Sequence, residues 1–433
     1  MITSETGIGW RSAAALVVAN MIGTGAFTTL GVQLEWMSNG PALLLLWGVG
    51  GLVAWCGAVS YAELGVRLPR SGGEAHFLSE IFHPVLGFLS GWVSLTVGFA
   101  AAVALSAMAV GSYLGGWLGC SPVWTAAASI VVLSAAHCLG TRQSSWLQNT
   151  LTALKLLVVL GLGLAGALLP VDGGGGVDWS LAGLSAAWSP GAGVAMISVF
   201  YAFSGWNAAA YIVGEIRNPG RDLPRALVYG TLLVSGLFLL LQYAFLHQAG
   251  TAALSGQIDV ARVAATAMFG AATGEFVSLL IGLLLLTGIS AMIWIGPRVV
   301  MAMGTGHDIW RTFGKTGRRG IPLRATWLQG GISLFLVFTA SFEQVLLYSG
   351  FVLQCFTFLA VFGLLVLRIR GAGTQEQCPY RAPWFPLPQL VFLGFSAWSL
   401  AYLLLHQPVE SLLGLLNVVA GLAAYYLDRP SRP

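Results

Sequence analysis

Long apolar runs separated by short polar segments recur along the whole 433-residue chain. A helix needs about 20 predominantly apolar residues to cross the hydrocarbon core of a bilayer, and most of these runs are of that order. The pattern therefore predicts an all-α polytopic membrane protein with about 12 spans. The candidate spans are residues 10–33, 41–66, 84–115, 122–139, 147–169, 190–214, 224–248, 274–303, 323–340, 345–368, 386–406 and 409–427. The stretch 258–272 is shorter and more polar, and we expect an interfacial helix there.

The composition excludes a soluble globular protein. Hydrophobic residues make up 57% of the chain and charged residues only 8%, against roughly 25% charged residues in ordinary globular domains. So few charges cannot cover a water-exposed surface of this size. The five cysteines are scattered and form no C-x-x-C pair, which indicates neither a disulfide framework nor a zinc site. No metal, no cofactor and no nucleic-acid partner is expected.

The basic residues predict how the chain is oriented. Connecting segments on one side of the membrane carry Arg67, Arg70, Arg142, Arg217, Arg221, Arg225, the run from Arg298 to Arg324, Arg368, Arg370 and Arg381. On the opposite side Arg262 is accompanied mainly by acidic residues. Cytoplasmic loops are enriched in Lys and Arg, so the basic side is predicted to be cytoplasmic. With an even number of spans both termini then lie in the cytoplasm, and we expect a multi-pass protein of the cell membrane.

Two candidate spans differ from the others in composition. The first contains Gly23-Thr24-Gly25 and the sixth contains Ser204-Gly205, each near mid-membrane. Glycine costs roughly 1 kcal/mol in a helix interior, so both spans are expected to unwind there. Unwound backbone is tolerated in a bilayer only where it lines a cavity or is buried in protein. Close packing of helices at small residues is the alternative explanation of each glycine cluster.

Spans one and six hold the same position in two successive groups of five spans. Interrupted helices at matching positions of two halves indicate the substrate site of a transporter. The N–H groups that start the second half of a broken helix carry partial positive charge and suit a carboxylate, whereas the C=O groups that end the first half suit an ammonium. The pattern therefore favours a small zwitterion such as an amino acid.

Motifs in and between these spans resemble those of a known family. Residues Gly23-Thr24-Gly25-Ala26-Phe27 resemble the G-[ST]-G-x-F signature on the first helix of the amino acid–polyamine–organocation (APC) permeases. Further stretches that resemble this family, in the same order, are 63–65, 68–74, 203–207, 214–219, 222–224 and 296–298. From its first span to its eighth, the chain is thus similar to LAT-like and bacterial amino acid permeases of this superfamily. The last four spans match only in number and hydropathy.

This resemblance implies a LeuT-like fold, in which two inverted five-helix repeats are followed by two extra helices. The first repeat would be residues 10–169, the second 190–368, and the extra helices 386–427. All of them would belong to a single transmembrane transporter domain, residues 1–433.

The resemblance also implies which residues bind the substrate. The residues implied for its carboxylate, through backbone N–H groups, are Thr24, Gly25 and Ala26, beside Gly23. The residues implied for its amino group, through backbone carbonyls, are Met21, Tyr201, Ala202 and Ser204, with Trp206 and Asn207 nearby. The Tyr201 ring would cap the substrate as a gate, and ordinary packing in the core is the alternative. Polar side chains of the third and eighth spans are further pocket candidates, namely Ser94, Thr96, Thr287 and Ser290.

One cation, Lys155, lies within the fifth span. An ammonium at such depth costs about 2.5–3.5 kcal/mol on insertion scales, so it needs a partner or a function. The interface near Trp146 is about 13 Å away at about 1.5 Å per residue, beyond the reach of a lysine side chain. Lys155 therefore either sits where sodium would otherwise bind or takes up and releases protons. Many sodium-independent members of the resembled family carry a lysine on this helix, which implies sodium-independent transport by proton coupling or exchange.

The acidic residues help to predict the substrate class. Glu63 and Glu215 lie at span ends, and the other carboxylates fall in loops or tails, so none is expected at the depth of the binding site. A cationic substrate would need an acidic partner there, so a neutral L-amino acid is favoured over a cationic amino acid or a polyamine. Glu63 and Glu215 either latch a gate with nearby arginines or form ordinary surface ion pairs.

The expected function is that of a secondary active transporter, surrounded by membrane lipid and without an obligate protein partner. A nutrient sensor built on a transporter fold is an alternative, because such a protein would bind substrate without moving it. An enzyme is not expected, since the chain contains neither H-E-x-x-H nor G-x-S-x-G.

Overall fold

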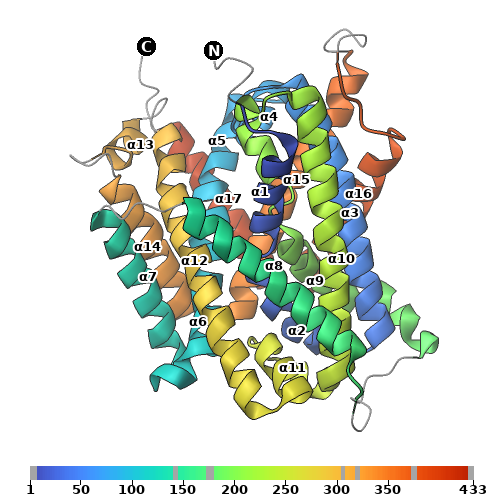
Figure 1. Ribbon diagram of the computed structural model, residues 1–433. Coiled ribbons are helices and arrows are strands. Elements are labelled where there is room, and N and C mark those ends of the chain that lie inside the picture. Colours follow the sequence, from blue (N-terminus) through green and yellow to red (C-terminus); the bar gives the residue numbers. More distant parts are fainter. Residues whose placement is uncertain are drawn as a thin grey trace.

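The computed structural model describes residues 7–139, 145–171, 180–303, 308–316, 322–371 and 378–427. Over these ranges the chain folds into a bundle of long helices without any β-strand (Figure 1). Ten of the helices described are long and apolar enough to cross a membrane, and the bent pair α1 and α2 makes an eleventh span. The prediction of an all-α polytopic membrane protein is confirmed.

The helices follow the expected apolar runs closely. The first five runs become α1 (Trp10–Met21) with α2 (Gly25–Trp36), α3 (Gly40–Arg67), α5 (Pro84–Val93) with η1 (Ser94–Ala101) and α6 (Ala102–Leu118), α7 (Pro122–Leu139), and α8 (Ser145–Leu168). The other seven become α9 (Pro190–Phe203) with η3 (Ala208–Glu215), α10 (Pro219–Leu254), α12 (Ala271–Met303), α14 (Leu323–Thr339), α15 (Phe342–Ile369), α16 (Leu387–His406) and α17 (Pro408–Leu427). Four shorter helices connect them, α4 (Glu74–Ile81), η2 (Leu181–Trp188), α11 (Val260–Phe269) and α13 (Asp308–Phe313).

The expected count of spans differs from the observed one at α14. This helix occupies the ninth apolar run but has only 17 residues and carries Arg324 in its first turn. At about 1.5 Å per residue it is about 25 Å long, slightly less than the hydrocarbon core. It is therefore shorter and less apolar than the other spans, although it packs among them, against α7 and α12.

The bundle has two faces that bear on function. α1 begins and α17 ends at one face, at the top of Figure 1, which we call the terminal face. α4 and α13 lie at the terminal face, whereas α11 and η2 lie at the opposite, distal face (Figure 1). The helix expected within 258–272 is thus present as α11.

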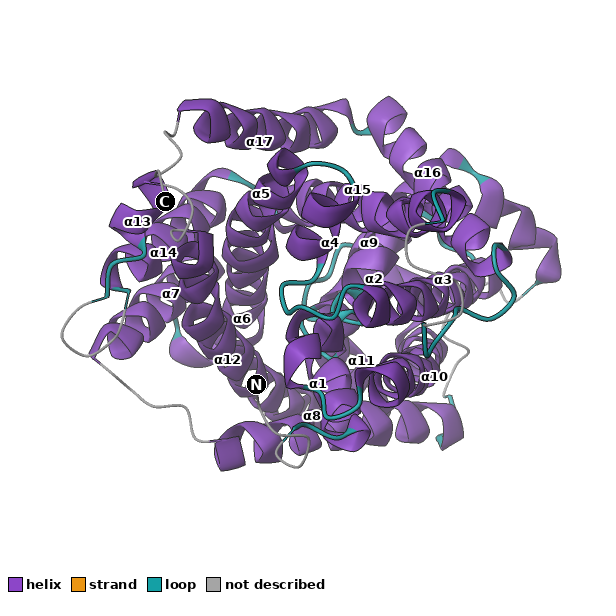
Figure 2. Cartoon of the chain, turned by 90° about the horizontal axis from the view of Figure 1, so that it is seen from above, coloured by secondary structure: helices purple, strands orange, loops and turns teal. Residues whose placement is uncertain are grey.

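The two interrupted spans lie inside the bundle. Seen from above, α2 and α9 are surrounded by other helices, whereas α8 and α17 lie at the edges (Figure 2). Every residue of α9 from Ala192 to Phe203 is buried, and so is α2 from Gly25 to Leu34. The third span contains a feature that hydropathy does not predict, because η1 is wound as a π-helix. Such widened turns frequently lie at functional sites.

Candidate substrate-binding site

The first span is interrupted between Met21 and Gly25. The half-helices α1 and α2 meet there with a bend of 41°. The backbone turns through Gly23, whose N–H donates to the carbonyl of Met21 at 2.8 Å. The N–H of Phe27 then donates to the carbonyl of Thr24 at 3.0 Å, which starts α2. The break expected in this span is present.

The start of α2 presents unpaired peptide N–H groups. The backbone amides of Thr24, Gly25 and Ala26 donate no hydrogen bond to any residue of the described ranges. Such groups at a helix N-terminus carry the positive end of the helix dipole and can bind an anion. The Thr24 hydroxyl lies 2.6 Å from the Ser106 hydroxyl of α6, which holds the turn in place. These are the amides from which carboxylate binding is predicted.

The sixth span is interrupted between Phe203 and Ala208. α9 ends at Phe203, where the N–H of Ser204 donates to the carbonyl of Tyr201 at 3.0 Å. Gly205 follows with a φ of +96°, a conformation that favours glycine. The span then continues as η3, which is a 3-10 helix and has non-helical angles at Ile212.

The two breaks touch each other through their backbones. A Cβ atom on Gly25 would lie 2.5 Å from Cα of Ala202, and a Cβ atom on Gly205 would lie 2.9 Å from the carbonyl carbon of Asn20. Only glycine permits so close an approach. Helix interruption and close helix packing, the two explanations of these glycines, therefore both apply, and the breaks form one site.

The carbonyls expected to hold an amino group lie at the ends of α1 and α9. The carbonyl of Met21 accepts one bond from Gly23, and that of Tyr201 accepts one from Ser204, so each keeps a second lone pair. Ala202 lies against Gly25, and Ser204 is half-buried. Carbonyl groups at helix C-termini carry partial negative charge and suit an ammonium.

The aromatic residues near the second break pack into the core. The Tyr201 side chain is buried in an apolar cluster with Leu105 and Phe342, which fits either of its two expected roles. The Trp206 ring lies edge-on to Tyr61, with 4.7 Å between ring centroids, and so faces α3 and not the first break.

The polar pocket candidates of the third and eighth spans are engaged elsewhere. The Ser94 and Thr287 hydroxyls donate to carbonyls of their own helices. Thr96 accepts a hydrogen bond from Asn417 of α17 at 2.9 Å, and Ser290 lies 2.8 Å from His137 of α7. None of these contacts reaches either break.

Lys155 lies buried on α8 with 8% of its surface exposed. Its Nζ is 3.8 Å from the position that a Cβ atom on Gly288 would take, so the side chain extends between α8 and α12. Within the described residues it forms no hydrogen bond or ion pair, the carbonyls of the first break included. Among the described residues its charge therefore has no fixed partner.

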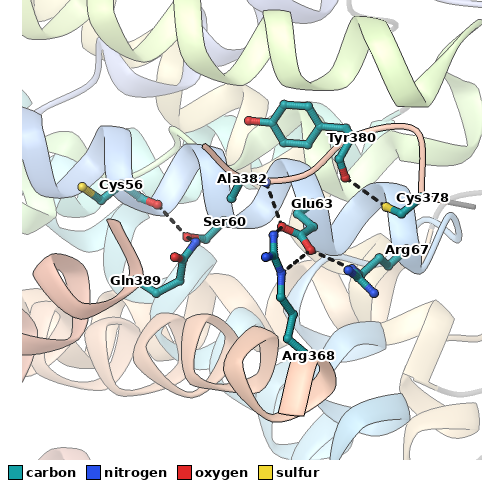
Figure 3. Close-up of polar contacts among 9 residues, drawn as sticks. All are labelled: Cys56, Ser60, Glu63, Arg67, Arg368, Cys378, Tyr380, Ala382 and Gln389. Carbon is teal, nitrogen blue, oxygen red and sulfur yellow. Dashed lines mark hydrogen bonds and ion pairs between the residues drawn. The ribbon is translucent and has the colours of Figure 1, made fainter. Parts of the chain in front are cut away.

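Glu63 forms a buried ion network at the terminal face. Its side chain is fully buried, and it accepts hydrogen bonds from Arg67 at 2.8 Å and from Arg368 of α15 at 2.9 Å (Figure 3). The backbone N–H of Ala382 donates to the same carboxylate at 2.8 Å, which ties the connection between α15 and α16 to α3. The expectation of an ordinary surface ion pair is wrong for Glu63. Glu215 is exposed.

Glu74 is a second buried carboxylate, and it lies beside the second break. It was expected in a loop, but it begins α4, is 4% exposed, and accepts a hydrogen bond from the Asn207 side chain at 2.6 Å. The expectation that Glu74 lies in a loop is wrong, because this segment folds back into the bundle as α4. Tyr61 and Tyr211 also donate to Glu74, so each of its two oxygens already accepts a hydrogen bond.

The residues on the two sides of the first break differ in how far they are covered. The Asn20 side chain is exposed although its backbone touches Gly205, and Gly23 is half-buried. On the distal side the Gly256 N–H donates to the Gly31 carbonyl at 3.0 Å, and the Tyr113 hydroxyl donates to the Phe27 carbonyl at 2.9 Å. These contacts cover α2. A separate cavity of about 550 Å³ lies at the distal face between residues 34–39 and η2, away from both breaks.

Comparison with known proteins agrees with this geometry. The chain matches the amino acid permease family over residues 8–419. It is 26% identical to the serine/threonine exchanger SteT of Bacillus subtilis over 97% of this chain and 96% of that protein. It is 28% identical to the b(0,+)-type amino acid transporter 1 of Homo sapiens (97% and 87%) and 26% identical to the large neutral amino acids transporter small subunit 2 of Mus musculus (97% and 80%). This multi-pass membrane protein therefore belongs to the amino acid permease family.

Proposed function

We propose that this chain is a secondary active transporter that moves a neutral L-amino acid across the cytoplasmic membrane by alternating access. The observation that carries the proposal is the meeting of two interrupted spans. N–H groups without a partner among the described residues start α2, and helix-end carbonyls lie at Met21 and Tyr201. This combination suits the two charges of an amino acid. The two breaks would belong to inverted repeats, 10–169 and 190–368, with residues 386–427 added and both termini cytoplasmic.

A neutral substrate is favoured by the surroundings of Glu74. Its carboxylate is buried and accepts hydrogen bonds from Tyr61, Asn207 and Tyr211, so a cationic side chain would have to displace neutral donors to pair with it. Two relatives are named for serine/threonine and for large neutral amino acids. A cationic amino acid or a polyamine is the alternative substrate class.

Sodium independence is proposed from Lys155. Its buried ammonium lies between α8 and α12 and would occupy the place of a coupling cation. Exchange is favoured over proton coupling, because the Bacillus subtilis relative is named as an exchanger. Since another relative is named as a small subunit, the absence of a protein partner stays a prediction.

Counterflow into liposomes tests the proposal. Purified protein is reconstituted with unlabelled L-serine inside and labelled L-serine outside, in sodium-free buffer, and the assay is repeated with other neutral and cationic amino acids and with polyamines. Transient accumulation of label is expected for neutral amino acids. A sensor would bind, as seen by thermal stabilisation, without accumulating label. Accumulation that requires a sodium gradient would contradict the role given to Lys155.

A further inference from the structure

The loop from Ser71 to Glu74 wraps around η3, the terminal half of the sixth span. The N–H of Gly72 donates to the carbonyl of Tyr211 at 3.1 Å, and the N–H of Gly214 donates to the hydroxyl of Ser71 at 3.1 Å. Gly73 has a φ of +56°, and a Cβ atom on it would lie 2.6 Å from the Tyr211 ring. The loop backbone and the Tyr211 ring are therefore in direct contact.

The carboxylate of Glu74 adds further contacts between this loop and η3. One of its oxygens accepts from the Tyr61 hydroxyl of α3 at 2.9 Å and from the Asn207 side chain at 2.6 Å. The other accepts from the Tyr211 hydroxyl. No cation of the described ranges pairs with Glu74, so three neutral donors from two spans satisfy a charge that is almost fully buried. Hydrogen bonds to a charged group are stronger than those between neutral groups.

η3 depends on such outside contacts because its own hydrogen bonding is poor. It is a 3-10 helix, whose geometry is weaker than that of an α-helix and is uncommon beyond a few residues. Backbone bonds also hold its end, since Ile8 N donates to the Glu215 carbonyl at 2.8 Å and Arg217 N donates to the Ile8 carbonyl at 3.0 Å. Glu74 differs from these contacts because it holds Asn207, directly after the break.

We propose that Glu74 is a positioning residue for transport. Its carboxylate fixes Asn207 and Tyr211 and thereby sets where η3 lies relative to α3 and to the first break. The carbonyls at Tyr201, Ala202 and Ser204 immediately precede this fixed point, so their placement depends on it. Half-helices at such breaks must also move during alternating access. The carboxylate therefore influences substrate affinity through η3, without touching the substrate.

The test combines a structural and a functional readout on full-length protein in lipid nanodiscs or liposomes. Hydrogen–deuterium exchange of peptides covering 204–216 is compared in wild type, Glu74→Ala, Glu74→Gln and the matched control Glu80→Gln. Glu80 lies on the same helix, is half exposed, and its nearest guanidinium, Arg70, is 3.9 Å away. Labelled L-serine counterflow gives the KM and the maximal rate of the same four proteins.

Glu74→Ala is expected to speed exchange in 204–216 and to raise the KM about tenfold, more than it lowers the maximal rate. Glu74→Gln, which keeps one acceptor oxygen, is expected to fall between wild type and Ala, and Glu80→Gln to match wild type. If Glu74→Ala does not fold, Tyr211→Phe removes one donor and keeps the ring on Gly73, and the same local increase in exchange is expected. If hydrogen–deuterium exchange in 204–216 is the same in Glu74→Ala as in wild type, the inference is overturned.

The counterflow measurement rests on the proposed function, whereas the hydrogen–deuterium exchange measurement does not. If L-serine shows no counterflow in wild type while exchange in 204–216 still rises in Glu74→Ala, the proposed transport of L-serine fails and the positioning role of Glu74 stands. If wild type transports L-serine but Glu74→Ala leaves both the exchange and the KM unchanged, the positioning role fails alone.

Discussion

The two interrupted spans are built differently on either side of their breaks. In the first span a short turn joins two regular α-helices, and α2 is buried from Gly25 to Leu34. In the sixth span only α9 is regular, and η3 continues as a 3-10 helix whose Tyr211 side chain is 37% exposed. The candidate site is thus bordered on the distal side by the buried, regular helix α2 and on the terminal side by η3, which is weakly hydrogen-bonded.

The site is expected to change shape on its terminal side. Regular, buried helices resist local opening, whereas segments with few internal hydrogen bonds open at low cost. Under the proposed function, the backbone amides of α2 would supply a fixed position for an anion, while η3 would adjust; side chains from outside the span, Glu74 and Ser71, contact it. We call α2 the fixed half of the site and η3 the adjustable half, and substitutions in each can test this division.

The largest effect is expected at Glu63, which touches neither break. Glu63→Gln leaves Arg67 and Arg368 without their buried counter-charge, which should destabilise the fold by about 3–5 kcal/mol. The control Glu80→Gln disturbs an exposed pair worth about 0–1 kcal/mol. Thermal unfolding in detergent measures both. A KM change in Glu63→Gln like that expected for Glu74→Ala would mean that general stability, and not a specific contact, holds η3.

The next effect is expected at the fixed half. Gly25→Ala places a Cβ atom 2.5 Å from the backbone of Ala202, so one helix must shift, and counterflow should fall about 100-fold or more. Gly48→Ala on α3 is the control, because a Cβ atom there meets no other atom within 4 Å. It should keep activity within about threefold of wild type. Equal losses in the two variants would show that the contact between the breaks is not what matters.

A smaller loss is expected at the adjustable half. Gly205→Ala forces a φ of +96° on a residue with a Cβ atom, at a cost of about 1–2 kcal/mol, and places that atom 2.9 Å from the carbonyl carbon of Asn20. Because η3 can yield, counterflow should fall only about tenfold, less than in Gly25→Ala. Gly236→Ala on α10, where the added Cβ atom meets no neighbour, serves as the control. A loss at Gly205 that exceeds the loss at Gly25 reverses the assignment of fixed and adjustable halves.

The smallest effect is expected at Ser106. Ser106→Ala removes the partner of the Thr24 hydroxyl, a hydrogen bond of about 1 kcal/mol, and should raise the KM about three- to fivefold. The α2 helix itself should stay intact, so the melting temperature should change little. No change in KM would indicate that the first break is held by backbone packing against Ala202 alone.

The sequence predicts the helices well because hydropathy and glycine placement are local signals. The apolar runs agree with the observed bounds to within a few residues, and both breaks fall where glycine clusters lie. The prediction of a span is least secure at α14, because this helix has only 17 residues and carries Arg324.

Contacts between distant segments could not be predicted in this way. Glu63 and Arg368 are 305 residues apart, and nothing local indicates that they meet. Glu74 follows two glycines in a polar stretch that is typical of a loop, and only the packed bundle shows that it is buried. The π-helix η1 and the 3-10 winding of η3 likewise depend on neighbours in space, since their own sequences are apolar and compatible with an α-helix.

The pairing of Ile8 with the residues that follow η3 has a practical consequence for labelling. Because these backbones are hydrogen-bonded to each other, Ile8 is attached to the end of η3 as well as being continuous with α1. A fluorophore placed just ahead of Ile8, with a quencher on the far end of α17, would follow each conformational cycle as a change in emission. Position 7 is thus a suitable attachment point for single-molecule fluorescence measurements of this protein.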